Sequence, residues 1–403
     1  MKIKQSPEDF IVEEISSRPL KDSGPYQVFL LEKKGIDTFG AKRIIGKEFK
    51  IPSKEIGLAG LKDKHALTRQ FVSFPSNYKI PVEWSQQSIK LKRLGFANQP
   101  ILLGDLDANR FTLIVREVKE FEVEKVRSSA MEVLRYGVPN YFDSQRFGSL
   151  RGTQSYIAKL IVKGDWEGAV KTILTSATRH DPAQVRHCRE HIKSGWGFWD
   201  KCMQACSSSP KARREKRIIA FLKENPKDFK SAFLLVEREL QKMYMAAYQS
   251  YLWNETVKVL LNRVHPPLSL RQVKYEAGRH LFPISISPDA AVSLSQTEIP
   301  LLNPDAQFSR EDVKFASLKV IKDEALFLDK LKIDGPDYLQ FRQGSRKMWI
   351  IPKSVSAPSV SIDERNSNPR FKFKKVEVSF ELPAGSYATV ILKAIGVEKK
   401  RRR

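Results

Sequence analysis

A change of hydrophobic periodicity after Pro139 constrains the fold of this chain more than any other feature of its sequence. Before Pro139, segments with apolar residues at every second position alternate with helical stripes, which is typical of an α+β domain. Residues 153–264 then show helical spacing almost throughout, and strand-like alternation returns near Lys347 and at Val376–Leu382. The sequence therefore predicts a mainly helical domain inserted into an α+β domain that both ends of the chain build.

Glycine and proline mark the first domain boundary. A helical stripe ends at Gly137, a residue suited to a helix C-cap, and Pro139 just beyond it cannot continue a helix. We expect an α+β catalytic domain made of residues 1–139 and 340–403, the second part ending in a basic tail, and an inserted helical domain made of residues 140–339.

Charge limits the partners of the chain. Its 403 residues include 70 Lys and Arg against 46 Asp and Glu, which gives a formal net charge of +24. Nucleic acid is the usual partner of such a protein. A membrane surface is the alternative, but the basic residues are spread through the chain instead of gathering on one amphipathic helix. The sequence has neither a long apolar stretch nor a signal peptide, so we expect a cytoplasmic monomer that does not contact membranes.

The cysteines raise the question of a metal site. All three cysteines and three of the six histidines lie between residues 180 and 206, namely Cys188, Cys202, Cys206, His180, His187 and His191. The spacing of His187 from His191 and of Cys202 from Cys206 places each pair on one helix face, as zinc ligands require. However, the chain has no C-x-x-C, and a helical domain with reduced thiols explains the same residues. We expect reduced thiols and no metal, with zinc as the alternative.

Gly57–Pro75, GLAGLKDKHALTRQFVSFP, carries the strongest candidate for catalysis. Gly60 indicates a turn, and Gln70–Phe74 alternates like a half-buried strand. Asp63 lies on the intervening loop, where neighbouring positive charge should keep its carboxylate ionised, as a nucleophile or base requires. The alternative is a solvated hairpin tip with ordinary surface charges.

A second stretch is rich in aromatic residues. Asn140–Gly148, NYFDSQRFG, combines three aromatic side chains with Arg146 and polar residues such as Gln145. This mixture suits base stacking and phosphate contact, although the aromatics could equally anchor one domain on another. Phosphate loops, G-x-G-x-x-G motifs and G-x-S-x-G elbows are missing from the sequence, which argues against NTP hydrolysis, Rossmann-type redox chemistry and α/β-hydrolase chemistry.

Taken together, these motifs resemble the TruD family of tRNA pseudouridine synthases. The resemblance covers nearly the whole chain and follows the family's motif order. Its pieces are Lys4 with PEDF ending at Phe10, AGLKDKHALTRQ at 59–70, NRFTL at 109–113, NYFDSQRFG at 140–148, AYQSYLWN at 247–254 and FELPAGSYAT at 380–389.

The resemblance implies a fold and a site. The fold is a pseudouridine-synthase catalytic domain with a central, mainly antiparallel sheet flanked by helices, and the helical insertion clamps tRNA. The resemblance also implies that Asp63 is the catalytic aspartate, acting on the uridine at position 13 of tRNA, and that Phe111 sits against the target base. Lys4, Asn109 and Phe380 complete the implied substrate-binding set. Residues in the same motifs are predicted RNA contacts: Lys62, Lys64, His65, Arg69, Gln145, Arg146, Gln249 and Asn254.

The chemistry of the reaction agrees with these residues. Forming pseudouridine breaks the N1–C1′ bond, turns the base and joins C5 to C1′, and this isomerisation needs no cofactor. It needs an unstacked base, an aromatic floor and a carboxylate. The residues leave open whether Asp63 attacks C1′ or removes the C2′ proton.

Two rival functions use the same features differently. A metal-dependent nuclease would need several carboxylates around Mg²⁺, and Asp63 stands isolated in its stretch. A non-catalytic RNA-binding protein would carry Asp63 as a surface charge and would leave the nucleosides of its bound tRNA unchanged.

Overall fold

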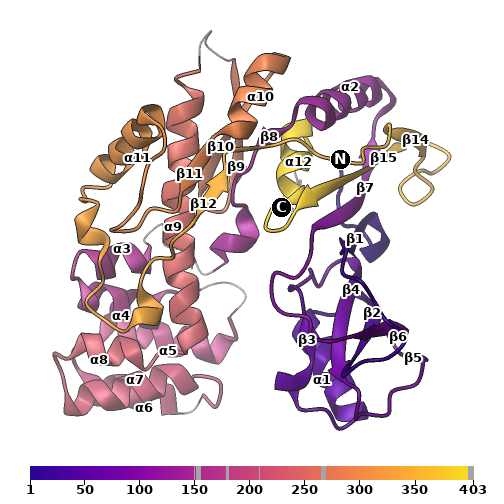
Figure 1. Ribbon diagram of the computed structural model, residues 1–403. Helices are drawn as coiled ribbons and strands as arrows, with labels where there is room; N and C mark the ends of the chain where they lie inside the picture. The colour runs from indigo at the N-terminus through magenta and orange to yellow at the C-terminus, as the bar shows by residue number, and fades with distance from the viewer. Residues whose placement is uncertain (149, 151–155, 178–180, 208, 265–268, 398–403) are drawn as a thin grey trace. The chain divides into compact units, whose positions relative to one another are not determined.

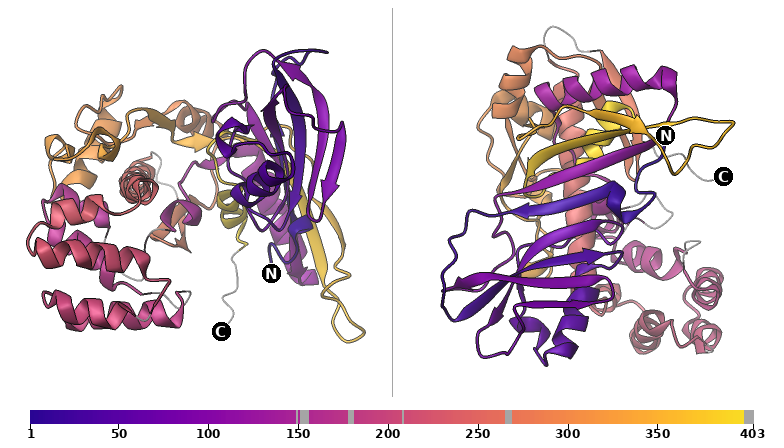
Figure 2. Two further views of the ribbon diagram at one scale, coloured as in Figure 1. Left: turned by 90° about the horizontal axis from the view of Figure 1, so that it is seen from below. Right: turned by 90° about the vertical axis from the view of Figure 1, so that its right-hand side faces the viewer.

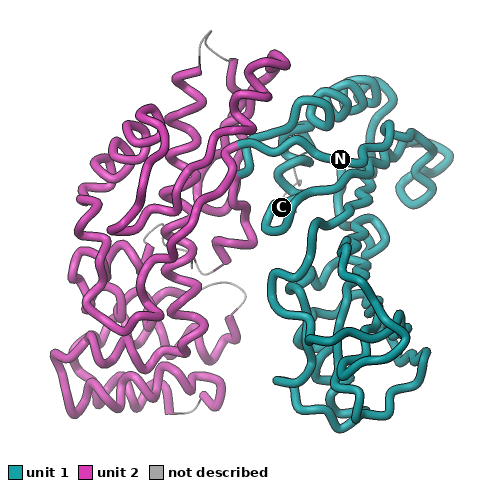
Figure 3. The backbone as a smooth tube through the Cα atoms, in the orientation of Figure 1, with its two compact units in different colours: residues 1–140, 349–403 teal, residues 141–348 magenta. Residues whose placement is uncertain are grey.

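The structure of the protein is a computed structural model that describes residues 1–148, 150, 156–177, 181–207, 209–264 and 269–397. It contains two compact units (Figure 3). Unit 1 holds residues 1–140 and 349–403, and unit 2 holds residues 141–348. Segments from both ends of the chain therefore build unit 1.

A nine-stranded sheet forms the framework of unit 1 (Figures 1 and 2). In order across the sheet its strands are β14 (Ser359–Ile362), β15 (Lys374–Pro383), β7 (Ala108–Val118), β1 (Phe10–Ile15), β4 (Leu67–Pro75), β2 (Tyr26–Lys34), β6 (Ile89–Ala97) and β5 (Glu83–Gln86), with β3 (Gly57–Leu58) paired to β4. The pairing of β1 with β4 is parallel, and the other pairings are antiparallel. The predicted α+β class and mainly antiparallel sheet are confirmed.

Helix α1 (Thr38–Glu48) covers one face of this sheet. On β2, Phe29 and Leu31 are buried and pack in one apolar cluster with Ala41 of the helix. Asp37 starts the helix, because its carboxylate accepts a backbone N–H of the first turn at 2.8 Å. The helix therefore fixes the segment before Thr38, which borders the candidate site described below.

The register of the central strands aligns the candidate side chains. Strand β1 places Glu14 opposite Asn109 of β7, and β15 on the other side of β7 places Phe380 opposite Phe111. Directly paired residues project from the same face of a sheet. Asn109 and Phe111 are two residues apart and also share a face, so all four side chains lie on one face.

The remaining helices of unit 1 are α2 (Glu120–Tyr136), which packs on β15, and α12 (Ala388–Ile395), which packs on α2. Two short strands, β8 (Val138–Pro139) and β13 (Trp349–Ile350), pair with each other. The predicted C-cap Gly137 has φ of 83°. A Cβ at this position would collide with the carbonyl oxygen of Ile350, so the close approach of the two segments requires glycine.

Unit 2 is mainly helical. Its described helices are α3 (Ile157–Val162), α4 (Trp166–Thr175), α5 (Ala183–Ser194), α6 (Trp199–Ser207), α7 (Arg213–Glu224), α8 (Phe229–Leu234), α9 (Arg238–Leu261), α10 (Pro288–Gln296) and α11 (Glu311–Asp323). Two two-stranded sheets accompany them, formed by β9 (Leu270–Tyr275) with β10 (Gly278–Pro283) and by β11 (Glu298–Pro300) with β12 (Ser345–Lys347). None of the helices in the described part of the chain is long and apolar enough to cross a membrane.

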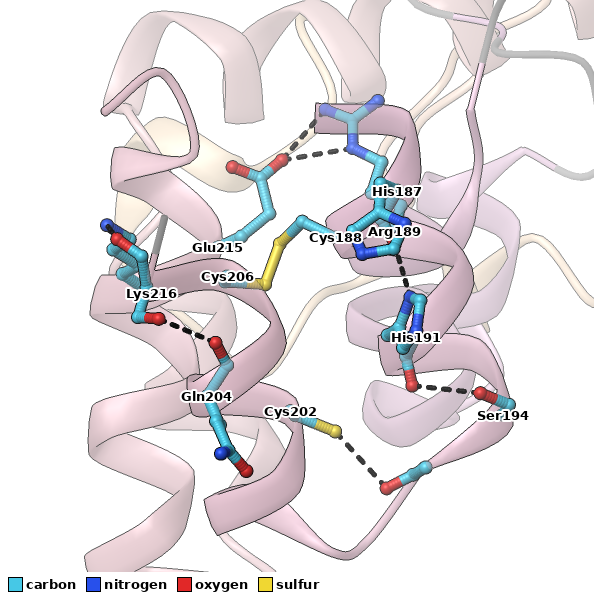
Figure 4. The surroundings of a disulfide bond; sticks show 12 residues. His187, Cys188, Arg189, His191, Ser194, Cys202, Gln204, Cys206, Glu215 and Lys216 are labelled. Carbon is cyan, nitrogen blue, oxygen red and sulfur yellow. Dashed lines mark hydrogen bonds and ion pairs between the residues drawn. A yellow bond between two sulfur atoms is a disulfide. The ribbon is translucent and has the colours of Figure 1, made fainter. Parts of the chain in front are cut away.

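A disulfide joins Cys188 of α5 to Cys206 of α6, as Figure 4 shows. The expectation of reduced thiols is therefore wrong for this pair. Packing of α5 against α6 brings the two Cα atoms to 4.8 Å, a long-range contact that helical spacing does not reveal. Cys202 remains a thiol that donates to the carbonyl oxygen of Gly195 at 3.2 Å, and burial raises its pKa.

The histidines of the same segment bear on the zinc alternative. The rings of His187 and His191 lie 4.1 Å apart between centroids, whereas His180 lies outside the described residues. Among the residues that are described, no group of three or more His, Cys, Asp or Glu side chains is arranged to hold a metal ion.

Candidate active site

Asp63 lies on the loop between β3 and β4, and side chains from neighbouring elements hold the backbone of this loop. The Thr38 hydroxyl accepts the backbone N–H of Lys62 at 2.9 Å, and the Gln70 amide donates to the carbonyl oxygen of Gly60 at 3.2 Å. The buried ammonium of Lys33 donates to the carbonyl oxygen of Asp63 at 3.0 Å. Burial lowers the pKa of Lys33 to about 8. The loop is thus fixed from α1, β2 and β4 at once.

Lys4 and His65 both provide donors to the Asp63 carboxylate. Lys4 forms an ion pair with Oδ2, and the backbone N–H of His65 donates to Oδ1 at 2.9 Å. The side chains of Asp63 and Lys4 are 16% and 17% exposed. Burial alone would raise the pKa of Asp63, but the charge and hydrogen bond of Lys4, with the His65 N–H, hold that pKa below its ordinary value. The carboxylate is therefore ionised at neutral pH although it is largely removed from water.

Lys4 reaches this position from an unusual backbone conformation. Its φ is 53°, in the left-handed region that residues other than glycine seldom adopt. Strain of this kind persists where the surroundings over-determine a conformation, and it is concentrated at functional sites.

An aromatic ring lies against the ion pair, and two further rings continue from it. The Lys4 ammonium is 3.7 Å from the centroid of the Phe10 ring. Phe10 meets Phe111 edge to face with centroids 6.2 Å apart, and Phe111 lies 5.9 Å from Phe380. Phe380 is fully buried, and Phe111 is 7% exposed. The structure therefore connects Asp63, Lys4 and an aromatic cluster, as a pocket for a flat base requires.

Lys62, the neighbour of Asp63, points into the sheet. Its ammonium lies 2.7 Å from Oε1 of Glu14 and donates to Oδ1 of Asn109 at 2.8 Å. The Lys62 side chain is only 8% exposed. Lys62 was predicted to contact RNA, but these two contacts favour a role in holding Asn109 in place.

The other predicted RNA contacts of the loop differ in their surroundings. Lys64 and His65 are exposed. Arg69 pairs with Glu13 at 2.6 Å and with Glu32 at 2.9 Å on the same sheet. Lys64 and His65 are thus open to a ligand, while Arg69 already has two carboxylate partners.

Four predicted RNA contacts belong to unit 2. Gln145 is exposed, and the guanidinium of Arg146 lies 5.3 Å from the centroid of the Phe142 ring. Gln249 and Asn254, both on α9, are buried. The Gln249 amide donates to the carbonyl oxygens of Leu302 and Arg342, while Asn254 accepts the N–H of Phe142 and donates to its carbonyl oxygen. These bonds favour a structural role for Gln249 and Asn254.

Sequence reasoning missed several residues that the fold brings to this site. Phe10 was present in the PEDF motif without an assigned role, and Glu14 is visible only through the register of β1 with β7. Thr38, Lys33 and Gln70 act on the loop backbone. A polar residue at a position expected to be buried, such as Gln70 within an alternating strand, is the signal that could have identified them.

Comparison with known proteins relates this site to an enzyme family. Residues 1–395 match the family described as tRNA pseudouridine synthase D (TruD). The chain is 36% identical to the probable tRNA pseudouridine synthase D 2 of Methanocaldococcus jannaschii, over 100% of this chain and 94% of that one. It is 30% identical to tRNA pseudouridine synthase D of Aquifex aeolicus, over 98% of each chain.

A solved structure gives the same result. The putative tRNA pseudouridine synthase D of Methanosarcina mazei superposes with a TM-score of 0.74 at 25% identity, covering 99% of this chain and 94% of that one.

Proposed function

The chain belongs to the TruD family of tRNA pseudouridine synthases, and from this premise we propose that Asp63 is its catalytic carboxylate. The predicted family is confirmed, and with it an enzyme that isomerises uridine in tRNA to pseudouridine. The observation that carries the assignment of Asp63 is its ionised, largely buried carboxylate beside an aromatic cluster.

The reaction explains why the carboxylate must be ionised. Cleavage of N1–C1′ needs either a nucleophile at C1′ or a base that removes the C2′ proton. When C5 then bonds to C1′, C5 must lose its proton and N1 must gain one, so the product has the same atoms as the substrate. An Asp63 carboxylate held ionised by Lys4 can perform either first step.

The aromatic cluster suits a base that has left its stack. Phe10, Phe111 and Phe380 form a continuous series of ring contacts that begins under Lys4. Asn109, two residues before Phe111 on the same strand and on the same face of the sheet, adds a polar amide. We propose that Phe111 and Asn109 contact the uracil and position its sugar at Asp63, while Phe10 and the buried Phe380 complete the substrate-binding set by supporting Phe111.

The tRNA substrate matches the charge of the chain, which is +24 in total. Exposed Lys64 and His65 in unit 1, with Gln145 and Arg146 in unit 2, are proposed contacts to the RNA outside the target base. Action on the uridine at position 13, a cytoplasmic location and a monomeric state complete the proposal.

The test is the substitution Asp63→Asn, which removes charge and basicity with almost no change of shape. We expect the single-turnover rate of pseudouridine formation to fall by at least about 10²-fold, because neither candidate first step can occur. Affinity for tRNA and the melting temperature should stay close to native. Asp22→Asn, the same change at an exposed residue of unit 1, serves as the control and should retain full activity. An Asp63→Asn enzyme with a tenth of the native rate would refute the assignment.

A further inference from the structure

A buried ion pair lies next to the proposed base pocket and takes no part in the chemistry assigned so far. The Glu14 side chain is fully buried, and each of its two oxygens faces a positively charged group or an N–H. Oε1 faces the Lys62 ammonium at 2.7 Å, and Oε2 accepts the backbone N–H of Phe71 at 2.8 Å. The same ammonium donates to Oδ1 of Asn109 at 2.8 Å. Lys62 therefore connects a buried carboxylate to one end of the Asn109 amide.

This contact determines which way the amide faces. An ammonium group has three donors and no acceptor, so it can hold the oxygen of Asn109 but not its NH₂ group. Rotating the amide by half a turn would direct NH₂ at the ammonium, which would leave buried donors facing each other at a high cost. Asn109 is itself 9% exposed, so water compensates little. The NH₂ group of Asn109 therefore points away from Lys62.

Glu14 keeps this arrangement in place. Burial raises the pKa of its carboxyl group, and the charge of Lys62 opposes that change. Without Glu14, the Lys62 ammonium would be a buried cation with a neutral partner only, and it would turn toward water. Glu14 is therefore a positioning residue that acts through Lys62.

We propose that Glu14 and Lys62 orient Asn109 so that its NH₂ group donates to O4 of the target uracil. Asn109 would then be the residue that distinguishes uracil from cytosine. The proposal rests on the proposed function, in which Asn109 borders the base. Cytosine carries an amino group where uracil carries O4. A fixed NH₂ group at this position can donate to O4 of uracil, whereas it would face the amino group of cytosine, which is also a donor.

The first experiment measures base preference without turnover. Enzyme carrying Asp63→Asn is titrated with two transcripts of one tRNA that the native enzyme modifies, with uridine or cytidine at the modified position. We expect the uridine transcript to bind about tenfold more tightly, since the cytosine complex leaves a buried donor unsatisfied. Adding Asn109→Asp keeps the acceptor for Lys62 but replaces the donor by a second acceptor, so the preference should shift to cytidine. Equal binding of the two transcripts, or a preference for uridine that survives Asn109→Asp, would overturn the proposal.

The second experiment tests the lock, meaning the Glu14–Lys62 ion pair that fixes the orientation of the Asn109 amide. Lys62→Met and Glu14→Gln, each added to the Asp63→Asn enzyme, free the amide to turn and should reduce the preference for uridine to about twofold or less. Lys90→Met removes an exposed lysine that pairs with Glu32 at 3.6 Å on the same sheet, and it should keep the full preference. If Lys62→Met melts like its parent and keeps the full preference, the lock is refuted even if Glu14→Gln fails to fold. The proposed function is judged separately, by the turnover of Asp63→Asn.

Discussion

A substitution of Phe111 can distinguish a packing role from a catalytic one, because each role predicts a loss of a definite size. The residue is 7% exposed and contacts one ring on each side, Phe10 and Phe380. Phe111→Leu removes two aromatic pairs, each worth about 0.5 to 1.5 kcal/mol beyond the area they bury, so unfolding should become easier by about 1 to 3 kcal/mol. In a unit of this size that corresponds to about 2 to 12 °C in melting temperature.

Activity should respond differently from stability. If the ring also stacks on the uracil, the lost stacking is worth about 1 to 3 kcal/mol, which predicts a further 5- to 150-fold loss of single-turnover rate at 25 °C. Phe74→Leu is the matched control, because Phe74 is fully buried on the same sheet and pairs with Phe29 at 5.5 Å. The control loses one aromatic pair, worth about 0.5 to 1.5 kcal/mol, and should retain activity. Melting curves and rates that change in parallel for both variants would show that Phe111 is merely part of the core.

Two further predictions concern charge and the disulfide. Lys4 holds the pKa of Asp63 below its ordinary value against the opposing effect of burial, and activity requires the ionised form, which is present above that pKa and lost below it. Lys4→Met should therefore move the acid limb of the pH–rate profile to higher pH. Lys2→Met changes an exposed lysine and should leave the acid limb in place. Coincident profiles for the two variants would contradict this reasoning. The disulfide closes a loop with a sequence separation of 18, so its reduction should cost about 3 kcal/mol of stability in unit 2. Thermal melts with and without reductant should differ for the native protein and coincide for Cys188→Ala/Cys206→Ala, and a native protein indifferent to reductant would refute the estimate.

Local patterns predicted the secondary structure around the site well. Alternation at Gln70–Phe74 and the turn at Gly60 anticipated β4 and the loop that carries Asp63. Gly137 correctly marked the end of α2, and the Asp37 cap that starts α1 is equally local. These features succeed because the chemistry that fixes them, a cap or a strand period, lies within a few residues of sequence.

Contacts between distant segments could not be predicted in this way. Lys62 lies 47 residues from Asn109, and only the register of the sheet and the path of the loop bring them together. The same limit applies to Lys62, whose motif predicts an RNA contact but does not reveal that its ammonium pairs with the buried Glu14. Gln249 and Asn254 are a similar case, because these polar residues of one helix bind backbone groups that lie far from them in sequence.

The pairing of β7 with β15 has a consequence for the synthesis of the protein. Arg110 on β7 bonds to Glu381 on β15, 271 residues later. At about 5 to 20 residues per second, the ribosome needs about 15 to 55 s to supply the second strand after the first. Throughout that interval Phe111 lacks its neighbour Phe380, and one edge of β7 stays unpaired while unit 2 is being made. The nascent chain is thus exposed to strand-pairing errors until β15 arrives.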